Sequence, residues 1–340
     1  MKLDLRNGRV EMGHGAGGRA MAQLIAELFA KLLGNDYLAQ GDDGAVLPAL
    51  PGRLVMSTDS HVVSPLFFPG GDIGSLAVNG TVNDVTVMGA RPLYLAAAFI
   101  LEEGYPLAEL RRIVESMARA ALAAGVLVVT GDTKVVEKGK GDGVFISTTG
   151  VGVAREGVTL SGKQARPGDS ILLSGSIGEH GTAILSQRAG LAFDASIVSD
   201  CAALNGLVEA MLDSGAELRV LRDPTRGGLA STLNELAQQS AAGMLLDEAA
   251  IPVIPAVAAA CEFLGLDPCY VANEGKLVAI CAARDADRLL EVMRRHPLGQ
   301  NAALIGEVIA DSHAFVQMTT RIGGRRILDW LSGEQLPRIC

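Results

Sequence analysis

The sequence predicts two domains of mixed helices and strands, followed by a short C-terminal tail. Three observations point to this α/β architecture. At 340 residues the chain exceeds what one hydrophobic core usually serves. Helical and strand-like hydrophobic patterns alternate along both halves. Between residues 160 and 169 the periodicity lapses and turn residues gather, so we expect domains at 1–160 and 168–331 and a tail at 332–340.

The composition indicates a soluble, cytoplasmic protein that binds neither nucleic acid nor a membrane. Hydrophobic residues make up 49% and charged residues 20% of the chain, as is typical of globular domains. The longest apolar stretches, such as residues 94–101, fall short of the ~20 residues that a membrane helix needs. The first residues lack the apolar segment of a signal peptide. A net charge of −9 without a basic cluster argues against a nucleic-acid partner.

Five cysteines stand apart from one another, at positions 201, 261, 269, 281 and 340. The odd count and the lack of a Cys-x-x-Cys pair argue against a disulfide framework and against a zinc site. We therefore expect a reducing compartment, the cytosol. Cys261 and Cys281 lie in apolar runs, where we expect them to be inert core residues.

The first motif is a glycine-rich segment in front of an amphipathic run at residues 19–33. Residues 13–18 (Gly-His-Gly-Ala-Gly-Gly) match the dinucleotide fingerprint G-x-G-x-x-G. That fingerprint follows a buried strand, however, and residues 7–12 are short and polar. A glycine-rich loop before a helix can instead wrap phosphates with its backbone N–H groups, or serve as a mobile flap. The candidate nucleotide contacts here are Gly15, Gly17 and Gly18.

Aspartates occur at three boundaries between buried elements and loops. They are Asp42 and Asp43 before an apolar stretch, Asp59 after a strand-like segment at 53–56, and Asn83-Asp84 at the end of an apolar helical run at 73–82. Carboxylates brought close together repel one another, so their convergence requires a cation. Oxygen ligands without His or Cys favour Mg²⁺ held against phosphates. The alternative is that each aspartate caps a helix or a turn.

A charged motif follows the next predicted strand. The pattern predicts a helix at residues 106–125 and a buried strand at 126–130, which runs into Gly131-Asp132-Thr133-Lys134. At the end of a strand we expect Lys134 to contact a phosphate and Asp132 to hold magnesium or to position the lysine. A surface ion pair between the two is an equally good interpretation. A strand at 144–154 ends the first domain.

The second domain contributes two polar turns next to strands. A strand at 218–221 leads into Arg222-Asp223-Pro224-Thr225-Arg226-Gly227-Gly228 and a helix through residue 241. This turn suits an anion or the rim of a nucleotide site, and also a simple helix cap. Asn273-Glu274 precedes a strand at 277–281, where Glu274 is a candidate general base or merely a turn residue. Further strands near 171, 303 and 315 and a helix from 284 complete the domain.

The last nine residues, Ser332 to Cys340, end the chain on a thiol. Gly333 supplies slack and Pro337 disfavours a helix. Nine extended residues span at most about 30 Å, enough to return into a cleft. The thiolate is the reactive form; the α-carboxylate disfavours it, and Arg338 partly offsets that charge. The alternative is a frayed, exposed terminus.

Taken together, these motifs resemble those of the HypE family of hydrogenase maturation factors. The stretches that carry the resemblance are 41–46, 57–60, 82–90, 130–136, 222–228, 272–276 and the terminal Pro-Arg-Ile-Cys at 337–340. The resemblance extends from about residue 11 to the end, and the terminal motif together with Asp-Pro-Thr-Arg-Gly-Gly is highly specific. The wider superfamily is the PurM-like one, which includes aminoimidazole ribonucleotide synthetase, thiamine monophosphate kinase and selenophosphate synthetase.

The resemblance implies a fold, a reaction and partners. The fold would be PurM-like, with an N-terminal ATP- and magnesium-binding domain that forms a homodimer through its sheet, a C-terminal α/β domain and a mobile tail. The reaction would be the ATP-dependent dehydration of a carboxamide on Cys340 to an S-cyano group. The carbamoyl group would come from the carbamoyltransferase HypF. The cyanide would pass to iron held by the HypC–HypD complex, for the nickel–iron centre of a hydrogenase.

Under this hypothesis the candidate residues take three roles. Cys340 would carry the substrate, Glu274 would be the base, and Lys134 would act on the phosphate or in relay with the base. The magnesium ligands would come from Asp42, Asp43, Asp59, Asp84 and Asp223. The nucleotide contacts would be Gly15, Gly17, Gly18, Asp59, Asn83, Asp132, Thr133, Asp223, Thr225, Arg226, Gly227 and Asn273.

Two other functions are compatible with the sequence. An ATP-dependent kinase or synthetase of the same superfamily would act on a diffusible small molecule, and removal of Cys340 would leave it active. A non-catalytic scaffold would dock a partner through its tail and would not need to bind ATP.

Overall fold

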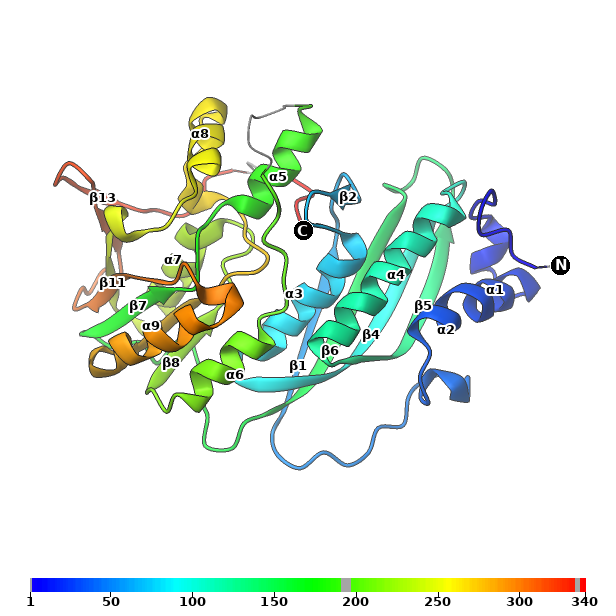
Figure 1. Cartoon of the computed structure of the whole chain (residues 1–340), viewed down its shortest axis with the longest axis horizontal. Coiled ribbons are helices and arrows are strands. Elements are labelled where there is room, and N and C mark those ends of the chain that lie inside the picture. The colour runs from blue at the N-terminus through cyan, green and yellow to red at the C-terminus, as the bar shows by residue number, and fades with distance from the viewer. Residues whose placement is uncertain (1, 191–196, 334–336) are drawn as a thin grey trace.

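The computed structural model describes residues 2–190, 197–333 and 337–340 and shows two lobes side by side (Figure 1). The N-terminal lobe is built on a four-stranded sheet and the C-terminal lobe on a seven-stranded sheet. The expected tail at 332–340 includes three residues, 334–336, that lie outside the described part. None of the helices in the described ranges combines the length and the apolar character that crossing a bilayer requires.

The N-terminal sheet has the strand order β1-β6-β4-β5. Its strands are β1 (Leu54–His61), β4 (Ala90–Glu102), β5 (Leu127–Val136) and β6 (Val144–Ala154). β4 pairs with β5 in parallel, whereas β6 runs antiparallel to both β1 and β4. Helices α3 (Ile73–Val87) and α4 (Leu107–Ala124) pack on the sheet. β1 and β5 are therefore the two edges of this sheet.

Helix α3 is buried on nearly all sides because it lies between the sheet and the C-terminal lobe (Figure 1). Its apolar residues are spread around the helix and not confined to one face, which is the pattern of a buried helix. Asp72 caps its N-terminus, where the carboxylate accepts hydrogen bonds from the backbone N–H groups of Gly74 and Ser75. Helix α4 is amphipathic instead and ends where Gly125 adopts a left-handed conformation.

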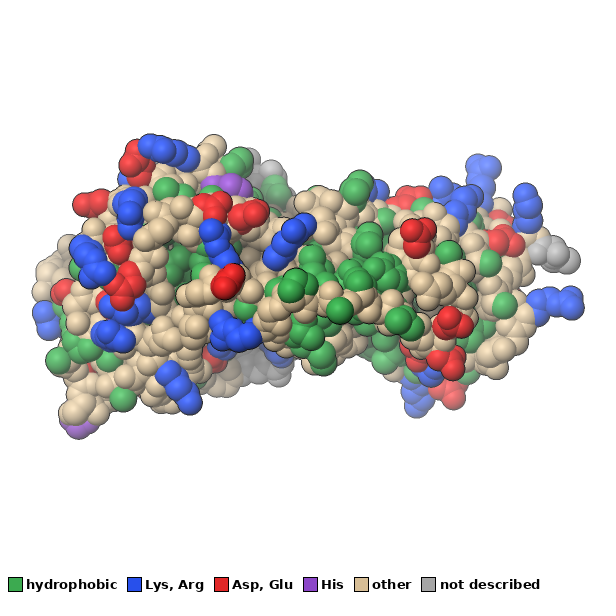
Figure 2. All heavy atoms as spheres, turned by 90° about the horizontal axis from the view of Figure 1, so that it is seen from below, with side chains coloured by type: hydrophobic (Ala, Val, Ile, Leu, Met, Phe, Trp, Pro, Cys, Tyr) green, Lys and Arg blue, Asp and Glu red, His purple; other side chains and the backbone are tan. Residues whose placement is uncertain are grey.

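The sheet of the N-terminal lobe keeps apolar side chains on the surface. Leu54 and Met56 of β1 are 61% and 71% exposed, and Ile100 of β4 and Leu127 of β5 are also exposed. Figure 2 shows hydrophobic side chains gathered on the N-terminal lobe when it is seen from below. A contiguous exposed apolar surface of this kind is typical of a protein–protein interface.

The N-terminal lobe is completed by a helical stretch and two very short strands. The helical stretch consists of α1 (Arg19–Leu24), a π-helical turn (Ile25–Phe29) and α2 (Ala30–Leu33). The short strands are β2 (Phe67–Phe68) and β3 (Gly71–Asp72), which lie just before α3 in the chain.

The C-terminal sheet has the strand order β13-β12-β9-β11-β7-β10-β8. Its strands are β7 (Asp169–Leu173), β8 (Leu218–Arg222), β9 (Gly243–Asp247), β10 (Val278–Ala282), β11 (Ala303–Ile309), β12 (Val316–Thr319) and β13 (Arg325–Ile327). The helices of this lobe are α5 (Glu179–Arg188), α6 (Asn205–Asp213), α7 (Gly228–Ser240), α8 (Pro255–Leu264) and α9 (Ala286–Arg295).

The central strands of this sheet are buried on both faces. Ile171 and Leu173 of β7 belong to the core formed with α7, whereas Leu172 belongs to the core formed with α6 and α9. Successive side chains of a strand point to opposite faces, so one strand serves two cores. This explains why the predicted strands at 171–174 and 277–281 read as continuous apolar runs.

Three expectations about motif positions are wrong. Asn83 and Asp84 do not close their helix, because α3 continues to Val87 and the chain turns only at Gly89, with φ of +73°. Asp59 lies within β1, not after it. Residues 131–134 likewise continue β5, because the long strand β4 offers pairing partners as far as Val136.

Candidate active site

The end of the chain lies between the two lobes, beside β2 and α5 (Figure 1). The backbone N–H of Val62 donates to the carbonyl of Cys340 (3.1 Å), and that of Ser64 donates to the carbonyl of Arg338 (3.2 Å). The side chain of Ile339 is buried and belongs to the hydrophobic core of the N-terminal lobe. Residues 337–340 are therefore docked on their own chain, in the manner of a short added strand.

Helix α5 supplies two side chains that hold the docked end. His180 Nε2 lies 2.7 Å from the carbonyl oxygen of Ile339. The Arg188 guanidinium donates to the carbonyls of Pro337 (2.6 Å), Arg338 and Ser64. The guanidinium of Arg338 in turn pairs with Asp142 at 2.7 Å. The contacts from α5 are made to backbone carbonyls, so they recognise the path of the tail more than its side chains.

The thiol of Cys340 lies against the carboxyl group of Glu274, with which it shares a hydrogen bond. Glu274 is 4% exposed, and burial, followed by the charge of Asp200, raises its pKa well above the ordinary value. Burial and then the Glu274 charge raise the pKa of the Cys340 thiol, which Arg226 partly opposes. Within the described ranges Glu274 Oε1 has no hydrogen-bond partner. A buried carboxylate with a raised pKa and a free oxygen is suited to accept a proton.

Three predicted metal ligands approach one another beside this pair. Burial and then the charge of Asp84 raise the pKa of Asp223 to about 7. Burial also raises the pKa of Asp84, an effect that Asp59 increases. Asp84 accepts a hydrogen bond from the Ser57 hydroxyl at 2.7 Å. Mutual repulsion of carboxylates is the condition under which a hard cation binds favourably.

The other two predicted metal ligands do not join them. Asp42 and Asp43 lie in an exposed loop between α2 and β1. Across the described ranges, no three His, Cys, Asp or Glu side chains are close enough to form a complete metal site. Of the predicted set, Asp59, Asp84 and Asp223 fit a magnesium ion by donor chemistry, whereas Asp42 and Asp43 do not approach it.

A cavity of about 690 Å³ opens next to these aspartates, between the lobes. Its lining includes Ser57, Asp84, Asp223 and Thr225. The turn that carries the last two residues leads into α7 through Gly227 and Gly228, which have φ of +77° and +60°. A side chain at Gly228 would collide with the carbonyl groups of residues 269–271, so the turn must approach that loop closely.

Lys134 and Asp132 lie elsewhere. They form a surface ion pair on β5 (2.7 Å), with Lys134 62% exposed. β5 is the edge strand farthest from β1, so three strand spacings, about 14 Å, separate it from the strand of Asp59. Thr133 between them is buried. Within a single chain, the structure does not bring Lys134 to Glu274 or Cys340.

The glycine-rich segment also lies at the β5 edge. Gly15 packs against Val135, and a Cβ on Gly15 would lie 2.6 Å from the backbone nitrogen of Val135. Gly17 and Gly18 face open space in front of α1. The segment follows a single isolated bridge at Arg9 and not a buried strand, so the dinucleotide-fingerprint interpretation lacks its required context.

Two of the predicted nucleotide contacts, Asn83 and Asn273, use their side-chain amides for hydrogen bonds within the chain. Asn83 accepts from the N–H of Leu204 (2.8 Å) and donates to the carbonyl of Ala202 (3.0 Å). Asn273 accepts from the N–H of Gly178 (2.7 Å) and donates to the carbonyl of Pro224 (3.0 Å). In this structure both amides tie loops together around the site, and neither points a free polar atom towards a ligand.

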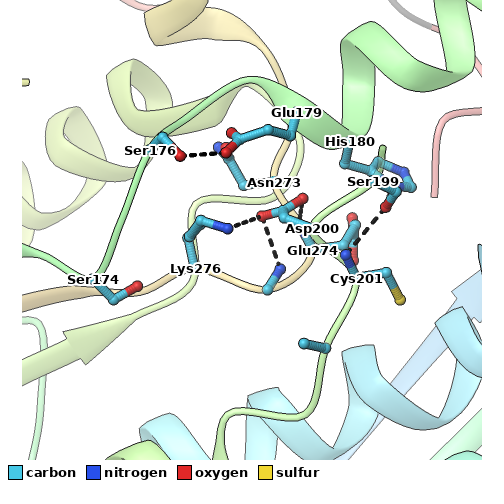
Figure 3. A network of polar contacts seen from close by, with 12 residues as sticks. Ser174, Ser176, Glu179, His180, Ser199, Asp200, Cys201, Asn273, Glu274 and Lys276 are labelled. Carbon is cyan, nitrogen blue, oxygen red and sulfur yellow. Dashed lines mark hydrogen bonds and ion pairs between the residues drawn. The ribbon is translucent and has the colours of Figure 1, made fainter. Parts of the chain in front are cut away.

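Sequence reasoning missed the residues that surround Glu274. Figure 3 shows Asp200 next to the Glu274 loop, with Lys276, Glu179 and His180 nearby. Asp200 accepts hydrogen bonds from the N–H groups of Glu274 and Gly275 and pairs with Lys276, each at 3.2 Å. Residues 199–201 lie in a stretch without helical or strand periodicity. No local pattern therefore marks them, and only the fold brings them to the site.

The two lobes match two domain families. The family described as "AIR synthase related protein, N-terminal domain" matches residues 41–154, and the corresponding C-terminal domain matches residues 166–319. A thiamine-monophosphate kinase from Stenotrophomonas maltophilia shares the fold at 20% identity, with a TM-score of 0.66 over 90% of this chain and 97% of that chain. These matches confirm the expected PurM-like fold.

Full-length relatives are more similar. "Carbamoyl dehydratase HypE" of Azotobacter vinelandii is 71% identical over 339 residues, covering 100% of this chain and 99% of the relative. The protein of the same name from Cupriavidus necator is 68% identical and covers 99% and 97%, respectively. A crystal structure of HypE in complex with ATP matches with a TM-score of 0.94 at 52% identity, over 97% of this chain and 99% of that chain.

A structure of a HypE–HypF complex also matches, with a TM-score of 0.80 at 49% identity over 91% of this chain and 99% of that chain. The identities and the coverage confirm the resemblance that the motifs carry. The chain belongs to the HypE family.

Proposed function

We propose that this chain is an ATP-dependent carbamoyl dehydratase that acts on its own C-terminus. The carboxamide on the sulfur of Cys340 becomes an S-cyano group, while ATP becomes ADP and phosphate. The observation that carries the proposal is the docked end of the chain, which holds the reactive sulfur against a buried base. The relatives named carbamoyl dehydratase and the ATP complex of a 52% identical HypE support it.

The residues of this chain divide the work between binding and proton transfer. ATP supplies the phosphoryl group that makes the amide oxygen a leaving group. Loss of that oxygen as a nitrile forms requires the nitrogen to give up both protons. Glu274 is placed to accept one of them, and the departing phosphate can take the other. The buried setting keeps water away from the reacting group. Because the substrate is tethered, its effective concentration does not depend on diffusion.

We assign magnesium binding to Asp59, Asp84 and Asp223. Burial and then mutual repulsion raise the pKa of Asp84 and Asp223. The ion would offset that repulsion and would neutralise charge on the nucleotide phosphates. The adjoining cavity, lined by Ser57 and Thr225 among others, offers room for the nucleotide between the lobes. Asp42 and Asp43 stay outside this assignment, because within a single chain their exposed loop does not join the three aspartates.

We assign the exposed apolar side chains of the N-terminal sheet to a homodimer. A two-fold axis parallel to the strands would lay β1 of one copy over β5 of the other, because these strands are the opposite edges of the sheet. Lys134, Asp132 and Thr133 of one copy would then face the aspartates of the second copy. This arrangement explains how an exposed ion pair takes part in phosphoryl transfer.

The protonation state of the Cys340 thiol determines at which stage the carbamoyl donor and the cyanide acceptor react with it. Since burial raises the pKa of the docked Cys340, the docked thiol is a poor nucleophile, and loading with a carbamoyl group takes place when the tail is released. We propose HypF as the carbamoyl donor, supported by the complex of a 49% identical HypE with HypF. The HypC–HypD iron carrier would accept the cyanide in the cytoplasm.

The test compares the wild-type chain with Cys340→Ser, each supplied with a HypF-type carbamoyltransferase, its carbamoyl donor and ATP. We expect donor-dependent ADP formation and transferable cyanide from the wild-type chain only. Equal ADP formation by the variant would indicate a kinase or synthetase with a diffusible substrate. Lack of ATP binding by the wild-type chain would indicate a scaffold.

A further inference from the structure

Asp200 is a buried acidic residue that the chemistry proposed above does not use. Its side chain is 3% exposed, and its two carboxylate oxygens accept from two backbone N–H groups and one ammonium group. The donors are Glu274, Gly275 and Lys276, three consecutive residues (Figure 3). A buried carboxylate with three donors is a well-satisfied anchor, because each bond offsets the cost of burying the charge.

The anchored loop carries the proposed base. Glu274 Oε1 has no partner in the described part of the chain, so apart from its contact with Cys340 the position of this carboxylate depends on its backbone. The loop also packs tightly on the segment of Asp200. A Cβ on Gly275 would lie 1.8 Å from the backbone oxygen of Asp200, so only glycine allows this approach.

The residue before Asp200 connects the same segment to the docked tail. His180 Nδ1 lies 2.8 Å from the Ser199 hydroxyl oxygen, and His180 Nε2 lies 2.7 Å from the carbonyl of Ile339. A carbonyl only accepts, so Nε2 carries the hydrogen, and Nδ1 of a neutral ring accepts from Ser199. Burial, which lowers the pKa of His180, favours that neutral ring.

The residues after Asp200 connect the segment to the N-terminal lobe. The amide of Asn83, on α3, bonds the carbonyl of Ala202 and the N–H of Leu204. The N–H of Ser199 donates to the carbonyl of Pro69 at 2.9 Å. Residues 199–204 therefore touch the base loop, the tail support and the lobe that carries Asp84.

We propose that Asp200 is a positioning residue for the dehydration, which fixes the Glu274 loop in register with the docked Cys340 through the segment 199–204. This inference rests on the proposed function and adds a residue to it. Asp200 touches neither the substrate nor the nucleotide; it acts through Glu274. Displacement of a reacting group by about 1 Å can lower a rate by about 100-fold, so loss of this anchor should be visible in kinetics.

The test uses a full-length chain whose Cys340 has been carbamoylated, followed by single-turnover formation of the nitrile after ATP addition. Asp200→Asn should lower the rate constant about 10- to 100-fold and leave the ATP concentration for half-maximal rate within about threefold. The acid limb of the pH–rate profile should move to lower pH, since one negative charge that raises the pKa of Glu274 is removed. The other titratable residues that interact with Glu274, namely Asp59, Asp223, Cys201 and the carbamoylated Cys340, are the same in both chains.

Asp169→Asn is the matched control. Asp169 is also a buried carboxylate. It accepts from one backbone N–H, that of Arg166 (2.8 Å), and like Asp200 it pairs with one cation, in this case Arg219 (2.7 Å). It lies at the far end of β7, about 17 Å of strand from the site. The Asp169→Asn substitution should lower the thermal stability of the chain. It should leave the rate constant of nitrile formation and the acid limb of the pH–rate profile unchanged.

Each outcome either supports or overturns the positioning role of Asp200. A nitrile rate for Asp200→Asn equal to that of Asp169→Asn would overturn this inference and leave the proposed function intact. Absence of nitrile in the wild-type chain would overturn both. Should Asp200→Asn fail to fold, Lys276→Gln keeps the two backbone bonds of Asp200 and removes its cation. We expect it to lower the rate at least threefold, and an unchanged rate would contradict the proposal.

Discussion

Two acidic side chains with a partner beside them, Glu274 with Cys340 and Asp132 with Lys134, differ in almost every physical property. Glu274 is buried, its pKa is raised well above its usual value, and one of its oxygens has no hydrogen-bond partner among the residues that the structure describes. Asp132 is exposed, and hydrogen bonding to Lys134 lowers its pKa. Both side chains end in a carboxyl group, so it is burial that decides which of the two is suited to proton transfer. The predictions below separate these two regions.

The largest effect should follow from Glu274→Gln. The amide keeps the shape of the side chain but cannot accept a proton, so nitrile formation on carbamoylated Cys340 should fall about 100- to 10,000-fold. ATP affinity should stay close to that of the wild-type chain, as measured by equilibrium binding. Nitrile formation at the wild-type rate would remove Glu274 from its role.

Lys134→Ala should lower the rate about 10- to 100-fold if the exposed pair acts from a second copy. A mixture of Lys134→Ala and Glu274→Gln chains then decides the geometry. Half of the randomly mixed dimers hold one complete site out of two, so about a quarter of the wild-type rate should return. A mixture as inactive as its components would place Lys134 in the site of its own chain.

Arg188→Ala tests the docked tail directly. Loss of a partly buried guanidinium that holds two tail carbonyls should free the tail and raise the alkylation rate of Cys340 about tenfold. Arg295→Ala, on the exposed end of α9, is the control, because its only ion pair is with Glu291 among the described contacts. Equal alkylation rates in the two variants would show that Arg188 does not retain the tail.

The smallest effect concerns stability. Because the folded-state pKa of Glu274 is raised, the folded chain binds more protons than the unfolded chain above pH 4.5, and its free energy of unfolding falls as pH increases through that window. Glu274→Gln removes this loss, so it should raise the Tm at pH 8 but not at pH 4. The shift is about 2–4 °C for each kcal/mol. A Tm difference independent of pH would contradict the pKa direction.

Local periodicity was enough for elements whose ends are set by local signals. The helix predicted at 106–125 is α4, which ends before the left-handed Gly125, and the strand predicted at 144–154 coincides with β6. The predicted ends of α3 and β5 were wrong because no local signal sets them. The end of α3 depends on the turn at Gly89, and the end of β5 depends on pairing along β4. The polar residues inside these two elements were therefore predicted to lie in loops.

Local motifs marked two residues that the structure brings together, Glu274 next to Asn273 and the terminal Cys340. The site was not predictable where distant residues meet. Asp200 lies 74 residues from Glu274, and His180 lies 159 residues from Ile339. Likewise, the position of Lys134 on the far edge follows from strand order, which no local pattern contains.

The central claim is that the buried end of the chain is itself the reactant. Intact mass measurement of the C-terminal peptide tests it most directly, after the carbamoylated chain is incubated with ATP and the reaction is quenched. We predict that the peptide ending at Cys340 loses the mass of one water in proportion to the ADP formed. ADP formation with a carboxamide that stays unchanged on Cys340 would contradict the claim.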